Sequence, residues 1–225
     1  MSRPSSIVLS TTVRASGIMT LEDIHDEIDR AWPRHLRETR ELLRVPSVSM
    51  TGEGIDETAG RLVDILSGMG AKAKMFRARK DSHPVVAGKI DVGADKTVLV
   101  YGMYDVMPVG DIDEWDHPPF GAKIVEKKPF GKVLVNRGVY NSKAALMGSL
   151  LAMRVMIDNG DLPTNVHVIL DGEEELGGPS FPTYVRRNRS TLSKAGAAFS
   201  FDYGENANGV PVICLGLKGT VYMDL

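Results

Sequence analysis

Apolar residues recur at steps of three or four along two segments near the N-terminus, which predicts two amphipathic helices. The first pattern comprises Leu21, Ile24, Ile28, Trp32 and Leu36, and the second comprises Ala59, Leu62, Val63, Leu66 and Met69. Pro33 is expected to kink or restart the first helix, and Gly68 and Gly70 to end the second. The segment before the first helix, residues 1–20, is rich in Ser and Thr and is expected to be a flexible arm.

Short apolar runs, several of them rich in Val and Leu, predict strands along the rest of the chain. They are Pro84–Ile90, Thr97–Tyr101, Lys132–Asn136, Val166–Leu170, Ala197–Phe201 and Val210–Leu215. A helical pattern over Ala144–Ile157 interrupts them. Because strands alternate with helices, we expect a layered α/β domain with a mainly parallel sheet flanked by helices.

Polar and acidic residues follow four of the predicted strands. These clusters are Met103–Asp105, Asn136–Lys143, Glu173–Glu175 and Asp202. In parallel sheets, ligands bind at the carboxyl ends of the strands, so these clusters are predicted to meet at one edge. Four such strand ends favour a functional site over four unrelated solvated turns.

The acidic run Glu173–Glu175 directly follows the apolar strand Val166–Leu170. Adjacent carboxylates repel one another, and a bound divalent cation would offset that repulsion. A carboxylate beside the cation could then act as a general base. Taken alone, the run is more typical of a solvated acidic turn than of a metal site.

Composition narrows the classes of function. The 225 residues are 43% apolar and 25% charged, as in ordinary globular proteins. The net charge of −2 shows no excess of positive charge that would favour binding to nucleic acid or to an anionic membrane. The single cysteine, Cys214, excludes an intrachain disulfide and suits a cytoplasmic protein. No apolar stretch approaches the roughly 20 residues of a membrane span, and Ile7–Leu9 is too short for a signal-peptide core.

Five segments together resemble the M20 family of metallopeptidases and aminoacylases, at the spacing of that family. They are Tyr101–Asp111, Glu114–Phe120, Asn136–Ala144, Asp171–Glu175 and Phe201–Asp202. The resemblance implies a zinc-peptidase-like catalytic domain over residues 21–225, with small-molecule substrates and divalent metals held by strand-end residues. It also implies that the chain stops before a dimerisation insert, so the protein is expected to form a homo-oligomer through a domain outside this chain.

The resemblance assigns roles to individual residues. Glu174 matches the general base, Glu175 a metal ligand and Asp202 a ligand of the other metal, whereas Glu173 has no role and is expected to be solvated. Asp105 matches a carboxylate that orients the metal-binding histidine. Tyr104, Arg137 and Met103 are weaker candidates for contact with substrate. The histidines, His83 among them, do not match metal positions and are expected to be ordinary surface or core residues.

Two positions depart from the family pattern. Met103 stands where the family has a metal-binding histidine, and Asn141 stands where it has a bridging aspartate. A thioether is a weak ligand for zinc or manganese, and a neutral amide oxygen bridges two cations poorly. We therefore expect one metal ion per subunit, zinc or manganese, with Glu175, Asn141 or Asp202 as ligands.

The sequence thus predicts a metal-dependent hydrolase of C–N bonds. An unusual site fits an aminohydrolase that acts on a small aromatic amine such as nitroanthranilate. An ordinary M20 peptidase or deacylase of N-acyl amino acids is the alternative. A catalytically inactive relative that serves as a scaffold is a further alternative, although the presence of Glu174 argues against it.

Overall fold

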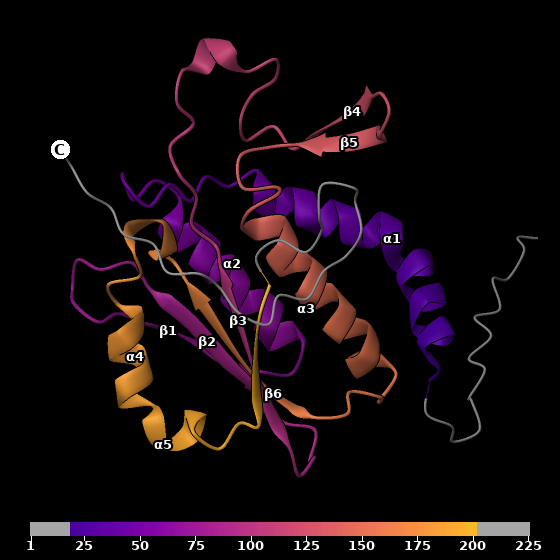
Figure 1. Ribbon diagram of the computed structural model, residues 1–225, viewed down its shortest axis with the longest axis vertical. Coiled ribbons are helices and arrows are strands. Elements are labelled where there is room, and N and C mark those ends of the chain that lie inside the picture. The colour runs from indigo at the N-terminus through magenta and orange to yellow at the C-terminus, as the bar shows by residue number, and fades with distance from the viewer. Residues whose placement is uncertain (1–18, 202–225) are drawn as a thin grey trace, which may run out of the picture.

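The computed structural model describes residues 19–201, which form five helices and seven strands (Figure 1). The helices are α1 (Leu21–Leu43), α2 (Ile55–Gly68), α3 (Lys143–Asp158), α4 (Phe181–Arg187) and α5 (Arg189–Leu192). The strands are β1 (Lys72–Phe76), β2 (Val85–Ile90), β3 (Thr97–Met103), β4 (Lys123–Lys127), β5 (Gly131–Val135), β6 (Asn165–Asp171) and β7 (Ala197–Ser200). Single 3₁₀ turns form at η1 (Ile112–Glu114) and η2 (Glu174–Leu176).

The main sheet has the strand order β1-β2-β6-β3-β7. Strand β3 pairs in parallel with both β6 and β7, while β2 pairs antiparallel with both β1 and β6. Four of the five strands therefore run in one direction and β2 alone runs against them, which confirms the predicted α/β class. The reversal of β2 places its first residues at the edge where β3 and β6 end.

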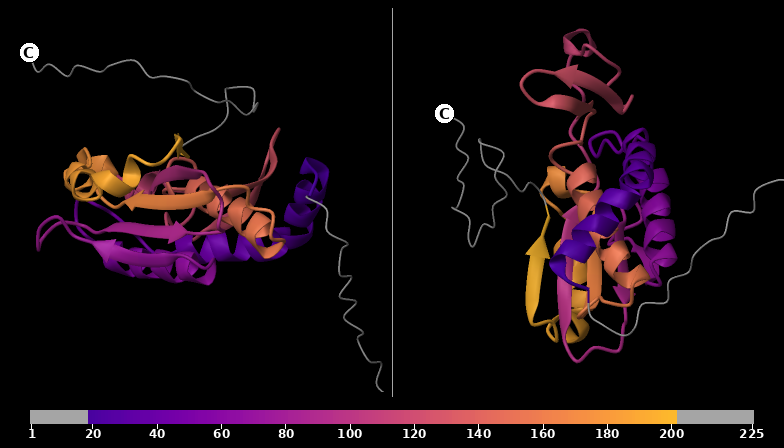
Figure 2. Two further views of the ribbon diagram at one scale, coloured as in Figure 1. Left: turned by 90° about the horizontal axis from the view of Figure 1, so that it is seen from below. Right: turned by 90° about the vertical axis from the view of Figure 1, so that its right-hand side faces the viewer.

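The helices cover both faces of this sheet (Figure 2). Helices α2 and α3 enclose the larger core with one face, and α1 packs against α3 (Figure 1). Helices α4 and α5 cover a smaller cluster on the opposite face, which includes Val85, Ile169, Tyr184 and Leu192. Burial of both faces explains why β6 is apolar at Val166, Val168, Ile169 and Leu170 rather than at every second residue.

The strand predicted over Lys132–Asn136 forms, but it does not belong to the main sheet. It corresponds to β5, which pairs antiparallel with β4 in a separate two-stranded hairpin (Figure 1). Its side chains are exposed or half-buried, as expected for a hairpin that projects from the domain. The prediction of a fourth parallel strand end from this segment was therefore wrong, because an apolar run does not reveal which strand it pairs with.

Helix α1 begins at a capping box: the Thr20 side chain accepts the Asp23 N–H, and the Asp23 carboxylate accepts the Thr20 N–H. Pro33 lies inside α1, which continues to Leu43 as one helix rather than restarting. Residues 1–18, most of the predicted arm, and the predicted strand Val210–Leu215 lie outside the described residues. Between residues 19 and 201, no helix is long and apolar enough to cross a membrane.

Candidate functional site

The candidate site lies where β3 and β6 end side by side. Met103 pairs with Asp171 at the ends of the two strands, and the Tyr104 N–H then donates to the Asp171 carbonyl at 2.9 Å. The next residue, Asp105, turns its carboxylate toward the segment after β6. Asp105 Oδ1 accepts the Glu174 N–H at 3.1 Å, and Oδ2 accepts the Glu175 N–H at 3.0 Å. The structure thus brings together three of the predicted site residues through the main chain of two of them.

Two further carboxylates hold the same turn. Asp171 Oδ1 accepts the Glu173 N–H at 3.0 Å, and the Glu173 carboxylate accepts N–H groups from His83 and Ser180. Glu173 is therefore buried, which corrects the expectation that it is solvated. The physical reason is that two backbone donors take the place of the water that a buried carboxylate loses.

The three carboxylates of this turn are almost inaccessible to solvent. The exposed fractions are 0% for Asp105, 1% for Asp171 and 4% for Glu173. Burial raises the pKa of Asp105 above its ordinary value, although the N–H groups of Glu175 and Glu174 oppose that shift. Burial also raises the pKa of Asp171 to about 6, and the neighbouring Asp105 and Glu173 charges add to the increase. Glu174 and Glu175, by contrast, are partly exposed.

Gly172 is required by this close packing. A Cβ at that position would lie 2.3 Å from the Tyr104 hydroxyl oxygen and 3.0 Å from the Pro84 carbonyl oxygen. The Tyr104 hydroxyl itself donates to that carbonyl at 2.5 Å. Any side chain at residue 172 would therefore displace β6 from the residues that support the turn.

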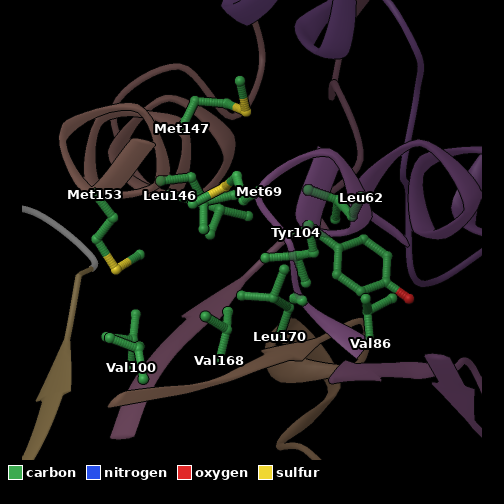
Figure 3. Packing of buried hydrophobic residues seen from close by; sticks show 14 of the residues in the cluster. Leu62, Met69, Val86, Val100, Tyr104, Leu146, Met147, Met153, Val168 and Leu170 are labelled. Carbon is green, nitrogen blue, oxygen red and sulfur yellow. The ribbon is translucent and has the colours of Figure 1, made fainter. Parts of the chain in front are cut away.

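Tyr104 does not face the candidate site at the ends of β3 and β6, contrary to the expectation that it contacts substrate. Its ring is fully buried among Leu62, Val86 and Leu170 (Figure 3). Met103, at the histidine position of the family, is also buried. Tyr104 belongs to the larger core, and because both side chains are buried, neither is available at the surface.

Asn141 lies just before α3, which begins at Lys143. Its side chain is exposed, and the next residue, Ser142, has φ of 138°, a value that favours glycine. The Ser142 hydroxyl donates to the Asp105 carbonyl at 2.8 Å, which holds the start of α3 against the β3 end. Backbone strain at a site edge is a sign of functional constraint.

Lys143 is a buried residue that the sequence did not single out. Its Nζ donates to the Val45 carbonyl at 2.5 Å and lies 5.8 Å from the centre of the Phe120 ring. Burial lowers the pKa of this amine to about 7. The bond ties the start of α3 to the connection between α1 and α2.

Arg137, another expected substrate contact, organises the loop that follows β3. Its guanidinium lies 5.2 Å from the centre of the Trp115 ring and donates to the Val109 carbonyl at 3.3 Å. The Trp115 indole N–H donates to the same carbonyl at 2.9 Å. The two side chains therefore fix the loop together, and this contact occupies part of the guanidinium.

The described residues do not complete a metal centre by themselves. Between residues 19 and 201, no group of three or more His, Cys, Asp or Glu side chains lies close enough to hold an ion. Glu174 and Glu175 offer hard oxygen donors and Asn141 a neutral one, whereas Asp202 lies outside the described residues. Glu174, Glu175 and Asn141 therefore form at most part of a metal site.

Sequence reasoning missed three residues that build this turn: Asp171, Glu173 and His83. His83 precedes β2, and its ring Nε2 lies 2.8 Å from the Ser49 carbonyl. Because β2 runs antiparallel to β6, His83 lies at the edge where β3 and β6 end. No local pattern in the sequence reveals the direction of β2. The spacing Asp171-x-Glu173 is a usable signal, because a carboxylate commonly accepts the N–H two residues ahead.

Comparison with known proteins agrees with the resemblance. A model of peptidase family M20/M25/M40 matches residues 99–211, just over half of the chain. The Cys-Gly metallodipeptidase DUG1 of Candida albicans is 27% identical over 92% of this chain and 46% of its own length. The succinyl-diaminopimelate desuccinylase of Delftia acidovorans is 30% identical over 65% of this chain and 37% of its own length.

Solved structures agree in fold. The M20 family metallo-carboxypeptidase Sso-CP2 of Sulfolobus solfataricus superposes with a TM-score of 0.71 and 37% identity, covering 78% of this chain and 38% of that one. Human carnosine dipeptidase 1 gives a TM-score of 0.73 at 22% identity, covering 82% of this chain and 41% of that one, and so shows the fold alone. The chain spans less than half the length of each of these relatives.

Proposed function

This chain belongs to peptidase family M20/M25/M40, and from that premise we propose that the complete protein is a metal-dependent hydrolase of C–N bonds. Its substrates would be small molecules with an amide bond, such as dipeptides or N-acyl amino acids. The names of the relatives support this class, since they include a dipeptidase, a desuccinylase and a carboxypeptidase.

The observation that carries the proposal is the capture of the Glu174 and Glu175 N–H groups by Asp105. Because one carboxylate binds both main-chain groups, the partly exposed side chains of Glu174 and Glu175 both start from one fixed turn. We assign Glu174 the role of general base, which takes a proton from the attacking water and returns it to the leaving amine. We assign Glu175 the role of metal ligand. A divalent metal, when bound, would polarise the scissile carbonyl and make water more acidic.

Asp105 then has a different role from the one that the resemblance implies. Its two carboxylate oxygens bind the Glu174 and Glu175 N–H groups, and the residue at the histidine position is the buried Met103. We propose that Asp105 acts on this site by holding the acidic turn rather than by orienting a histidine.

We further propose a single metal ion per subunit, held by Glu175 with Asn141 or Asp202 and by ligands outside the described residues. The support is chemical: Met103 is buried and offers only a thioether, and Asn141 is neutral. Zinc and manganese both suit the oxygen donors that remain. The same departures support the aminohydrolase of a small aromatic amine as a second candidate.

The test of the reaction is Glu174→Gln in the complete protein. We expect the variant to keep its metal and to lose turnover by about 10³-fold, because the base is removed while the ligand stays. Glu175→Gln is the matched comparison and should lose metal. Turnover of Glu174→Gln at the wild-type rate would show that another residue is the base.

A substrate panel of dipeptides, N-acyl amino acids and aromatic amines, assayed with zinc and with manganese, separates the two candidates. Hydrolysis of aromatic amines alone would favour the aminohydrolase. No turnover of any member, in a protein that binds no metal, would instead favour the scaffold.

The number of metal ions is tested by elemental analysis of the wild type and of Met103→His with Asn141→Asp. We expect about one ion per subunit in the wild type and a higher number in the double variant. Two ions in the wild type would contradict the proposal. Met103→Leu with Asn141→Gln is a control that changes both residues without adding a strong ligand.

We also propose that the complete protein is a cytoplasmic homo-oligomer. The single cysteine supports the compartment, and the resemblance supports assembly through a domain outside this chain. Light scattering of the complete protein measures the assembly, and a monomer at micromolar concentration would contradict it.

A further inference from the structure

Glu173 joins the two segments that flank the acidic turn. Its Oε1 accepts the His83 N–H at 2.8 Å, and its Oε2 accepts the Ser180 N–H at 3.1 Å. His83 lies just before β2, and Ser180 lies just before α4. Since both oxygens accept from N–H groups, the side chain acts as a carboxylate that bridges one strand and one helix across the turn.

The main chain of Glu173 is bonded as fully as its side chain. Its N–H donates to Asp171 Oδ1 at 3.0 Å, and its carbonyl accepts the N–H groups of Leu176 at 3.0 Å and Gly178 at 2.8 Å. The residue is therefore fixed on both sides of the single turn η2, which contains Glu174 and Glu175. A shift of Glu173 would move both of these residues.

We propose that Glu173 is a positioning residue of the candidate site. It fixes the turn by binding the N–H groups of His83 and Ser180, while Asp105 fixes the turn by binding the N–H groups of Glu174 and Glu175. Glu173 itself is buried and does not reach substrate. The consequence for catalysis rests on the proposed function, whereas the consequence for the turn does not.

The geometry separates this role from a general contribution to stability. Its carboxylate bonds connect the segment that carries the proposed base to His83 and Ser180, so their loss should change the position of Glu174 rather than unfold the domain. Catalytic groups tolerate little displacement, and a shift of about 1 Å can cost about 100-fold in rate. A positioning residue therefore changes kcat in molecules that remain folded.

The variant Glu173→Gln in the complete, metal-loaded protein tests the proposal. Glutamine keeps the length of the side chain and one acceptor oxygen, but its amide group faces one N–H donor and cannot accept it. We expect kcat to fall about 10- to 100-fold, with KM changed less than about threefold and circular dichroism unchanged.

Asp161→Asn is the matched control, because it makes the same change in a carboxylate that accepts a backbone N–H far from the site. Asp161 Oδ2 accepts the Met19 N–H at 3.1 Å beyond the end of α3. We expect its kcat to equal that of the wild type. An equal loss in both variants would show a general effect on the fold and would overturn the proposal.

Amide hydrogen exchange gives a second measurement that needs no turnover. In Glu173→Gln, we expect the His83 or Ser180 amide and the amides of residues 174–178 to exchange about tenfold faster than in the wild type. Glu173→Met, which has no acceptor and no charge, should increase exchange further and serves if the Gln variant does not fold.

The outcomes are distinct. Unchanged exchange in both variants would overturn the proposal, and so would faster exchange with an unchanged kcat. A wild-type protein without turnover, in which the variants still speed exchange of the turn, would overturn the proposed function and support the role of Glu173 in holding the turn.

Discussion

The turn after β6 and the turn before α3 both form hydrogen bonds with Asp105, and side chains hold the two turns in opposite ways. After β6, the carboxylates of Asp105, Asp171 and Glu173 accept backbone N–H groups. Before α3, the hydroxyl of Ser142 and the amine of Lys143 donate to backbone carbonyls. One turn thus gathers buried acceptors, and the other gathers buried donors.

The difference shows how burial affects the two sides. Burial raises the pKa of Asp171 to about 6 and lowers the pKa of Lys143 to about 7, so both groups shift toward their neutral forms. Neither charge is an obvious gain for stability. We interpret both as groups whose value is geometric, because each fixes a main-chain segment that carries a candidate site residue.

The largest expected effect comes from Asp105, where the two turns meet. Asp105→Ala removes the acceptors of both the Glu174 and Glu175 N–H groups but leaves the carbonyl that Ser142 bonds. We expect a loss of about 4 kcal/mol in the free energy of unfolding, since hydrogen bonds to charged groups contribute about 1.5–3 kcal/mol each. Turnover should fall about 100-fold through displacement of the base.

Urea denaturation and steady-state kinetics of the complete protein measure these two losses. Asp105→Asn keeps one acceptor oxygen and should lose about half as much stability. A free energy of unfolding for Asp105→Ala within about 1 kcal/mol of the wild type would contradict the conclusion that buried carboxylates hold the turn after β6.

A smaller effect on the free energy of unfolding is expected from the titration of Asp171, one of the buried carboxylates of the turn after β6. The folded-state pKa of Asp171, about 6, lies above the ordinary value of 3.8, so the folded state binds the proton more tightly than the unfolded state. This contribution to stability is fully present below about pH 4 and is lost as pH rises through 6. The shift corresponds to about 3 kcal/mol.

Asp171→Asn should abolish that part of the pH dependence while keeping an oxygen that accepts the Glu173 N–H. Free energies of unfolding for the wild type and the variant, measured from pH 4 to 7, give the difference directly. Asp161→Asn is again the control. Parallel profiles for the wild type and Asp171→Asn would mean that Asp171 is not the group responsible.

The smallest effect is expected on the donor side, at Ser142. Ser142→Ala removes the hydroxyl that donates to the Asp105 carbonyl and should cost about 1 kcal/mol. Ser142→Gly removes the same bond but relieves the strain of φ 138°. We therefore expect the glycine variant to be more stable than the alanine variant by about 1 kcal/mol, as measured by thermal unfolding.

Equal stabilities for the two Ser142 variants would indicate that the backbone at Ser142 is not strained. A glycine variant less stable than alanine would contradict the positive φ itself.

Individual elements show how far sequence patterns reach. The spacing of apolar residues predicted α1, α2 and α3, and short apolar runs predicted β2, β3, β6 and β7. Strand β1 was not predicted, because Lys72 and Lys74 alternate with few apolar residues and its side chains are half-buried or exposed. The pairing of β5 was predicted wrongly, because an apolar run does not indicate which strand it pairs with.

The sequence by itself determined the class of the fold, the convergence of Asp105 with Glu174 and Glu175, and the family. The first two follow from local periods and from the rule that parallel strands end at one edge, whereas the family follows from the five segments that resemble it. Only the tertiary structure decided that Glu173 is buried, that Tyr104 belongs to the core and that β2 is antiparallel to its neighbours. The bond between His83 and Glu173 spans 90 residues, and the bond between Asp105 and Glu174 spans 69. Burial and hydrogen bonding depend on which distant segments the fold brings together, and a local pattern of residues does not contain that information.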